Sequence, residues 1–203
     1  MTRSTKLIAA MMLTGLVAAC DPVTAVIGAG AEVGVAAGEE RGLGGAISDT
    51  KIQTAIDGLY INNKENGINI FRDINVTVHE GRVDLTGKVR TPEERVDAVR
   101  LAWQAAGVRQ VIDDIQVTDQ SGIIDYGRDV RIATVLRTKI LFDSKIRNIN
   151  YTVDVENAVI YLMGIAQSQE ELDLVIGYAR DIDGVKKVVN NVLLKTDPSR
   201  KSS

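Results

Sequence analysis

The feature that most constrains this 203-residue sequence is a 35-residue segment that occurs twice, 77 residues apart and without a gap. The first copy, VDLTGKVRTPEERVDAVRLAWQAAGVRQVIDDIQV, spans residues 83–117, and the second, IYLMGIAQSQEELDLVIGYARDIDGVKKVVNNVLL, spans residues 160–194. The shared positions are of the kinds that a backbone dictates: glycines, cap residues and apolar residues. They include Gly87/Gly164, Glu94/Glu171, Ala102/Ala179, Gly107/Gly184 and Val111/Val188. This pattern indicates a duplicated domain.

Each copy is typical of a strand, a capped helix and a second strand. Residues 91–94 form a capping box with proline at the first helical position, and residues 168–171 form another. Gly107 is placed to end the first helix with a left-handed cap. Apolar residues recur in that helix at helical spacing, so we expect the face that they form to be buried. Its members are Val96, Val99, Ala102, Trp103 and Ala106.

A further helix and a hairpin precede the repeated segment in both copies. Apolar residues at helical spacing predict a helix around residues 52–59, and alternation predicts a strand over 74–78. In the second copy the helix covers about residues 130–142 and the hairpin follows. We therefore predict an α+β fold of two tandem αββαβ domains. Each has a three-stranded mixed sheet with two helices on one face, because a strand–helix–strand crossover makes its strands parallel.

Residues 184–192, GVKKVVNNV, resemble the Gly-Val-x-x-Val-x-Asn-x-Leu/Val signature of the BON domain, a small module of bacterial envelope proteins. The first copy departs from it with Asp113 where the second has Asn190. The resemblance covers about 70 residues in each copy. With the N-terminus described next, the whole chain resembles the dual-BON lipoproteins of the outer membrane.

Residues 1–19 are typical of a signal peptide, with a basic start and an apolar run too short to span a bilayer. Val17-Ala18-Ala19-Cys20 fits a lipobox, and Cys20 is the single cysteine, without a disulfide partner in the chain. We predict that Cys20 is acylated, with palmitate-type chains, and becomes the mature N-terminus. The alternative is an ordinary signal peptide with an incidental cysteine. An aspartate after the lipidated cysteine, here Asp21, tends to retain enterobacterial lipoproteins in the inner membrane. The predicted location is therefore either the outer or the inner membrane, with the protein facing the periplasm.

The predicted boundaries follow from these features. They are 1–19 signal peptide, 20–47 lipidated cysteine and Gly/Ala-rich tether, 48–118 first BON domain, 119–124 linker, 125–195 second BON domain and 196–203 disordered tail. Gly30, Gly34 and Gly38 have helical spacing. The Gly/Ala-rich segment is therefore either a plain tether or a helix that lies on the membrane or docks on the first repeat.

Composition excludes several classes of function. The net charge of −3 becomes about −5 once residues 1–19 are removed, which is not typical of a nucleic-acid-binding protein. His79 is the single histidine, so no metal site, catalytic triad or cofactor is expected. Asp113 and Asp114 are adjacent in a strand and point to opposite faces, so they cannot act as a paired acid and base. We expect a protein that is not an enzyme.

The first helix of the second copy is basic, whereas its counterpart is slightly acidic. Basic side chains beside apolar ones suit anionic lipid headgroups, although a solvated helix face would have the same composition. The resemblance implies that this helix binds anionic phospholipid such as phosphatidylglycerol or cardiolipin. The residues that we predict for this contact are Tyr126, Arg128, Arg131 and Lys139. The family has an aromatic residue near the helix start where this chain has Arg131, with Tyr126 one turn earlier.

The resulting prediction is a non-enzymatic lipoprotein that maintains envelope and outer-membrane integrity. The alternative is a protein adaptor that docks on an outer-membrane assembly machine or a secretion complex through a sheet face or edge.

Overall fold

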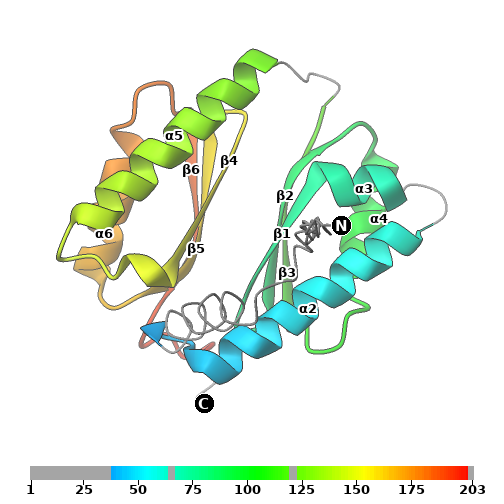
Figure 1. Ribbon diagram of the computed structural model, residues 1–203, viewed down its shortest axis with the longest axis horizontal. Helices are drawn as coiled ribbons and strands as arrows, with labels where there is room; N and C mark the ends of the chain where they lie inside the picture. Colours follow the sequence, from blue (N-terminus) through cyan, green and yellow to red (C-terminus); the bar gives the residue numbers. More distant parts are fainter. Residues whose placement is uncertain (1–37, 64–66, 119–122, 201–203) are drawn as a thin grey trace, which may run out of the picture.

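The computed structural model describes residues 38–63, 67–118 and 123–200, which form two domains (Figure 1). The first domain comprises α2 (Gly42–Asn62), α3 (Gly67–Asp73), β1 (Ile74–His79), β2 (Arg82–Val89), α4 (Pro92–Ala102) and β3 (Gln110–Val117). The second comprises α5 (Ile123–Phe142), the 3-10 turn η1 (Asn148–Asn150), β4 (Tyr151–Glu156), β5 (Val159–Ala166), α6 (Gln169–Arg180) and β6 (Lys187–Leu194).

Both sheets have the predicted topology. In the first, β2 is central, antiparallel to β1 and parallel to β3; in the second, β5 holds the same place between β4 and β6. The registers repeat as well, since Val83 pairs with Val111 and Ile160 pairs with Val188. The α+β fold predicted from the repeat is confirmed. One element was missed: α3, whose Ile70 is fully buried, occupies a stretch that begins where we expected a polar connection to end.

Each sheet covers its own apolar core. Ile56, Tyr60 and Leu85 are central to the first core, and Ile132, Leu136 and Leu162 to the second. The two helices that precede the hairpins therefore bury the faces that their spacing indicated, except that Ala55 is exposed. The first cap is as predicted, because Thr91 and Glu94 exchange both capping-box bonds. The second is half of the predicted box: Ser168 accepts from the Glu171 amide at 3.3 Å, but the Glu171 carboxylate accepts from the Gln167 amide rather than from that of Ser168.

The buried face of α4 was predicted only in part: Ala102 is fully buried and Val99 packs against the core, as expected, but the other predicted members face outward. The helix ends at Ala102 and packs through Ala98, Leu101 and Ala102, and Ala105 in the turn that follows is buried on the same side. Val96 is 65% exposed and Trp103 is 51% exposed. Small alanine side chains let the helix backbone approach the sheet closely, so they rather than the larger residues determine which side turns inward. Gly107 does adopt a positive φ of 96°, in the turn beyond the helix end.

The two domains pack with their sheets facing each other and their helices outside (Figure 1). We call the polar groups between the sheets the interdomain layer: Thr77, His79, Asp84, Asp114, Thr152, Asp154 and Asn191. Its contacts include Thr77 Oγ1 to Asp154 Oδ2 at 3.0 Å and His79 Nε2 to Thr152 Oγ1 at 2.9 Å. From the sequence alone, His79 would fall in the hairpin turn between the first two strands. It instead ends β1 and is buried, because its side chain points into this layer.

Both ends of the described chain bridge the domains, which changes the predicted boundaries. Ahead of α2, the Glu40 amide donates to Asn150 Oδ1 at 2.8 Å and its carboxylate meets Lys195 at 3.1 Å. The last ten residues of the predicted tether, 38–47, are therefore folded, while residues 20–37 and the helical alternative for them lie outside the described residues. The predicted disordered tail is ordered as far as Arg200, which binds Glu80. The predicted linker is shortened by α5, which begins at Ile123, and residues 119–122 are outside the described chain.

Candidate functional site on the outward surface of helix α5

One side of α5 anchors it to its own domain. Ile132, Leu136 and Ile140 enter the core, and the helix lies along β4. Near its start, the buried Asp129 carboxylate accepts bonds from the Asn157 and Ala158 amides at 2.7 and 2.8 Å. These contacts fix which residues of α5 face outward.

The outward side of α5 exposes large apolar side chains. Tyr126 is 74% exposed and Phe142 is 81% exposed, and Val130 and Leu141 between them are also exposed. Such residues contribute nothing to the core of the domain. A run of exposed apolar side chains along one helix marks a surface for a partner or a membrane.

The predicted basic residues lie together on one flank of α5. Arg131 donates to the Asp183 carbonyl at 2.7 Å, and the Lys139 ammonium lies 5.3 Å from the centre of the Tyr178 ring. Arg128 is half-buried, with a 3.4 Å bond to Asn157 and its guanidinium 3.8 Å from Asp129. Arg131 and Lys139 are thus positioned by neighbours yet exposed, whereas Arg128 is partly neutralised.

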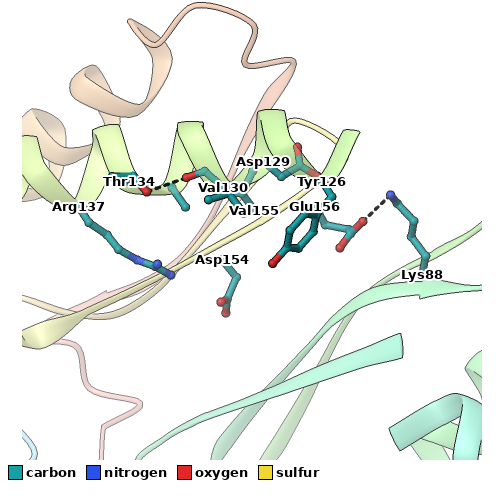
Figure 2. Close-up of a pocket in the computed structure, with 10 residues that line it drawn as sticks. Lys88, Tyr126, Asp129, Val130, Thr134, Arg137, Asp154, Val155 and Glu156 are labelled. Carbon is teal, nitrogen blue, oxygen red and sulfur yellow. Dashed lines mark hydrogen bonds and ion pairs between the residues drawn. The ribbon is translucent and has the colours of Figure 1, made fainter. Parts of the chain in front are cut away.

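The fourth predicted residue, Tyr126, lies on the other flank, where α5 borders the first domain. There it lines a cleft of about 390 Å³ together with Val130, Arg137 and Glu156 (Figure 2). Lys88 reaches into this cleft from β2 and pairs with Glu156 at 2.6 Å. The structure therefore does not bring Tyr126 together with Arg128, Arg131 and Lys139.

Arg137 is a residue that the sequence reasoning did not select. Its guanidinium donates to the Val153 carbonyl and points toward Asp154 in the cleft (Figure 2). Its position eleven residues after Tyr126 would place the two on the same side of a helix, which is the signal that could have found it.

The electrostatics of this surface are one-sided. Between residues 126 and 142 the sequence has four basic residues and one acid, and that acid, Asp129, is buried. Just past the helix, hydrogen bonds from the Lys145 amide and the Tyr178 hydroxyl lower the pKa of Asp143, so a carboxylate stands near Lys139. The charges that α5 itself shows to solvent over this stretch are all positive.

The described residues give little support for a metal site, a membrane-spanning helix or a paired acid and base. No group of three or more potential metal-ligating side chains occurs within residues 38–63, 67–118 and 123–200. Among the helices of those same ranges, none has the length and hydrophobicity required to cross a bilayer. Asp113 and Asp114 do point to opposite faces, because Asp113 pairs with Arg95 on the helix side and Asp114 with Asn191 in the interdomain layer.

Comparison with known families identifies the domains. A model described as the BON domain matches residues 48–119 and, separately, residues 128–196. The chain belongs to the BON-domain family. The resemblance seen in the glycine and valine pattern of residues 184–192 is thereby confirmed, and so is the presence of two BON domains.

Three relatives show how far the likeness extends. A protein of Anaplasma centrale, named only by its place in the gshII 5′ region, is 40% identical over 133 residues, 65% of this chain and 88% of its own length. The outer membrane lipoprotein DolP of Haemophilus influenzae is 27% identical over 167 residues, 82% of this chain and 85% of its own. The osmotically-inducible protein Y of Escherichia coli is 29% identical over 125 residues, 61% of this chain and 62% of its own.

Proposed function

We propose that this protein is a non-enzymatic lipoprotein of the bacterial envelope, anchored through Cys20, whose second BON domain binds anionic phospholipid through α5. Its role is to maintain the integrity of the envelope. The observation that carries the proposal is the outward surface of α5, where exposed apolar side chains stand beside Arg131, Arg137 and Lys139 with no exposed carboxylate among residues 126–142.

This combination suits the surface of an anionic membrane. Apolar side chains such as Tyr126 and Phe142 can enter the headgroup region, while basic groups near the surface contribute roughly 1 kcal/mol each. Because the helix is already folded and held by Asp129, binding needs no further ordering of its backbone. Both flanks of α5 would contribute, Arg131 and Lys139 on one and Tyr126 with Arg137 on the other.

The anchor and the destination rest on the sequence and on the relatives. Cys20 follows a lipobox, and the Haemophilus influenzae relative, which aligns over most of both chains, is named an outer membrane lipoprotein. We place this chain on the periplasmic side of the outer membrane, with the inner membrane as the alternative because of Asp21. Mass spectrometry of the mature chain tests acylation, and Cys20→Ser is expected to lose the acyl mass.

The experiment for the lipid surface is vesicle binding by the mature chain carrying Cys20→Ser, so that the anchor does not mask the contact. With phosphatidylglycerol or cardiolipin vesicles, Arg131→Gln with Lys139→Gln removes two exposed charges and is expected to weaken binding by about 2 kcal/mol, roughly 30-fold. The effect shrinks at high salt because the attraction is screened. Vesicles of neutral lipid serve as the reference.

The matched control is Lys51→Gln with Arg72→Gln, which removes the same charge from exposed positions of the first domain. An equal loss in both double variants would show that total charge, not α5, governs binding. Absence of binding by the parent would contradict the lipid proposal itself.

The second candidate function is a protein adaptor. The sheet faces, which we considered for docking, are turned toward each other, so this candidate now rests on the outer side of α4, where Val96 and Trp103 are exposed. A parent that ignores anionic vesicles but loses a partner upon Trp103→Ser would favour it.

A further inference from the structure

The interdomain layer buries acidic groups between two sheets. Asp84, on the central strand β2, is 1% exposed and Thr86 beside it is 3% exposed. On the other sheet, Tyr161 of β5 is also buried and lies close enough to Asp84 to be influenced by its charge. A carboxylate enclosed in this way has lost most of its hydration and depends on its neighbours for compensation.

The two sheet faces meet through equivalent positions of the repeat. Thr77 bonds to Asp154, and Asp114 bonds to Asn191, and each pair is 77 residues apart, the period of the duplication. Contacts of a residue with its own counterpart are characteristic of an isologous, two-fold arrangement. This packing therefore brings Asp84 and Asp114 of the first domain close to Asp154 of the second.

Asp84 is incompletely satisfied in this layer. Its Oδ2 accepts from the Asn191 side-chain amide nitrogen at 3.1 Å, and the same nitrogen donates to Asp114 Oδ2 at 2.8 Å. Asp84 Oδ1 is buried and has no hydrogen-bond partner within the described part of the chain. One neutral amide thus bridges two carboxyl groups, and a proton on Asp84 would relieve their repulsion.

The surroundings supply little positive charge to balance these carboxyl groups. Burial, followed by the nearby Arg41 and Arg82, lowers the pKa of His79 to about 3, so its ring is neutral. Lys88 is paired with Glu156. Arg82 alone among the named influences on Asp84 is a cation that favours its ionised form.

Asp154 and Tyr161, the other ionisable groups that face Asp84, offer its carboxylate no positive charge. Burial raises the pKa of Asp154, although Thr77 and Arg137 offset part of this rise, and burial raises the pKa of Tyr161, which keeps its proton. For Asp84 itself, burial raises the pKa to about 7, with Asp114 and Asp154 adding to the rise and the Asn191 amide opposing it.

We propose that the contact between the two BON domains is a proton-dependent joint, closed when Asp84 is protonated and loosened when its carboxylate is ionised. The residues that bridge the domains at the chain ends, Glu40 with Lys195 and Arg200 with Glu80, keep them from separating completely. Loosening is therefore a hinge motion that exposes the polar sheet faces.

The sign of the pH dependence follows from the two states. When the joint is open, Asp84 is hydrated and returns to its ordinary pKa of 3.8; when it is closed, the pKa is about 7. Between these values the closed form holds a proton that the open form releases, so closure is fully supported below the lower value and weakens as pH rises through the upper one. The closed-to-open ratio is expected to fall roughly 50-fold between pH 5 and pH 7, because each pH unit corresponds to a factor of about ten until the pH approaches the closed-state pKa.

Single-molecule FRET on the full mature chain tests this proposal. Dyes that are insensitive to pH are attached at Lys51→Cys on α2 and Thr138→Cys on α5, both exposed positions, in a Cys20→Ser background. The parent is expected to show one high-transfer population at pH 5 and a growing low-transfer population toward pH 8. Asp84→Asn, which is neutral at every pH and close in shape, is expected to remain in the high-transfer population throughout.

The matched control is Asp181→Asn, which removes a carboxyl from the exposed end of α6 and is expected to keep the pH response of the parent. A parent whose FRET distribution is the same at pH 5 and pH 8 would overturn the proposal. So would an Asp84→Asn variant that responds to pH as the parent does. The parent titration needs no substitution in the interdomain layer, so the test stands even if Asp84→Asn impairs folding.

Discussion

Gly87 and Gly164 occupy equivalent positions on the central strands, where the start of the neighbouring strand crosses close by. Their φ angles are 130° and 140°. A Cβ atom at Gly87 would lie 2.2 Å from the Asp73 carbonyl oxygen, and one at Gly164 would lie 2.0 Å from that of Asn150. Both the backbone angle and the closeness of another backbone require glycine here.

Gly164→Ala is therefore expected to destabilise the second domain by more than about 3 kcal/mol, because strain and a backbone clash add. Gly184→Ala is the comparison: its φ is also positive, at 85°, but the nearest atom to an added Cβ is the end of the Arg131 side chain at 3.5 Å. That variant should lose only about 1 kcal/mol. Urea unfolding followed by circular dichroism measures both, and equal losses would show that the clash is relieved by movement of η1.

At the scale of single elements, one aspartate ties the first helix of each domain to the hairpin. Asp49 on α2 accepts from the Glu80 and Gly81 amides at 2.8 and 2.9 Å, and Asp129 on α5 accepts from Asn157 and Ala158 in the same way. The turns of the hairpins are 77 residues apart, whereas the two aspartates are 80 apart. The first domain thus has three more residues between its helix and its hairpin, in the region of α3.

Asp129→Ala would leave two turn amides without an acceptor in a buried place, which costs on the order of 2–4 kcal/mol. Asp129→Asn keeps one acceptor oxygen and should lose about half of that. Urea denaturation of the two variants measures the difference. Losses that do not differ would mean that the negative charge, rather than the number of acceptors, stabilises the turn.

At the scale of the whole molecule, two separate apolar cores are held in one arrangement by polar contacts. The interdomain layer lies in the middle, and the chain ends bridge the domains at one side. Arg200 is the last link: its guanidinium pairs with Glu80 at 2.7 Å and donates to the Lys195 carbonyl at 2.8 Å, and the side chain is 12% exposed. Because such a pair is largely shielded from water, its removal should be measurable.

Arg200→Ala is expected to raise amide hydrogen exchange at the hairpin around residues 79–82 and over residues 195–200, by on the order of 1–2 kcal/mol in local opening free energy. Exchange in the cores around Leu85 and Leu162 should be unchanged. Arg180→Ala, an exposed arginine at the end of α6, is the control. Faster exchange throughout both cores would contradict the separation of the two domains.

Much of this architecture was predictable because it depends on local chemistry and on a period in the sequence. Caps such as Thr91 and Ser168, the positive-φ glycines, and the alternation of the strands are short-range signals, and the 77-residue repeat made each domain a check on the other. The basic composition of α5 was equally visible, since helical spacing alone separates Ile132 and Leu136 from Arg131 and Lys139.

Which residues and surfaces lie opposite one another was decided only by the tertiary structure. The inward side of α4 depends on how closely its alanines approach the sheet, so the large apolar residues Val96 and Trp103 did not indicate it. That the first domain borders the Tyr126 side of α5, so that Tyr126 shares a cleft with Lys88, follows only from how the domains pack. His79 and Asp84 are buried because two sheet faces, each polar enough to be exposed to solvent, pack on each other. The alternation of residues within one strand does not indicate that contact, because each sheet face on its own has the composition of an ordinary solvent-exposed surface, polar or with a short apolar stretch.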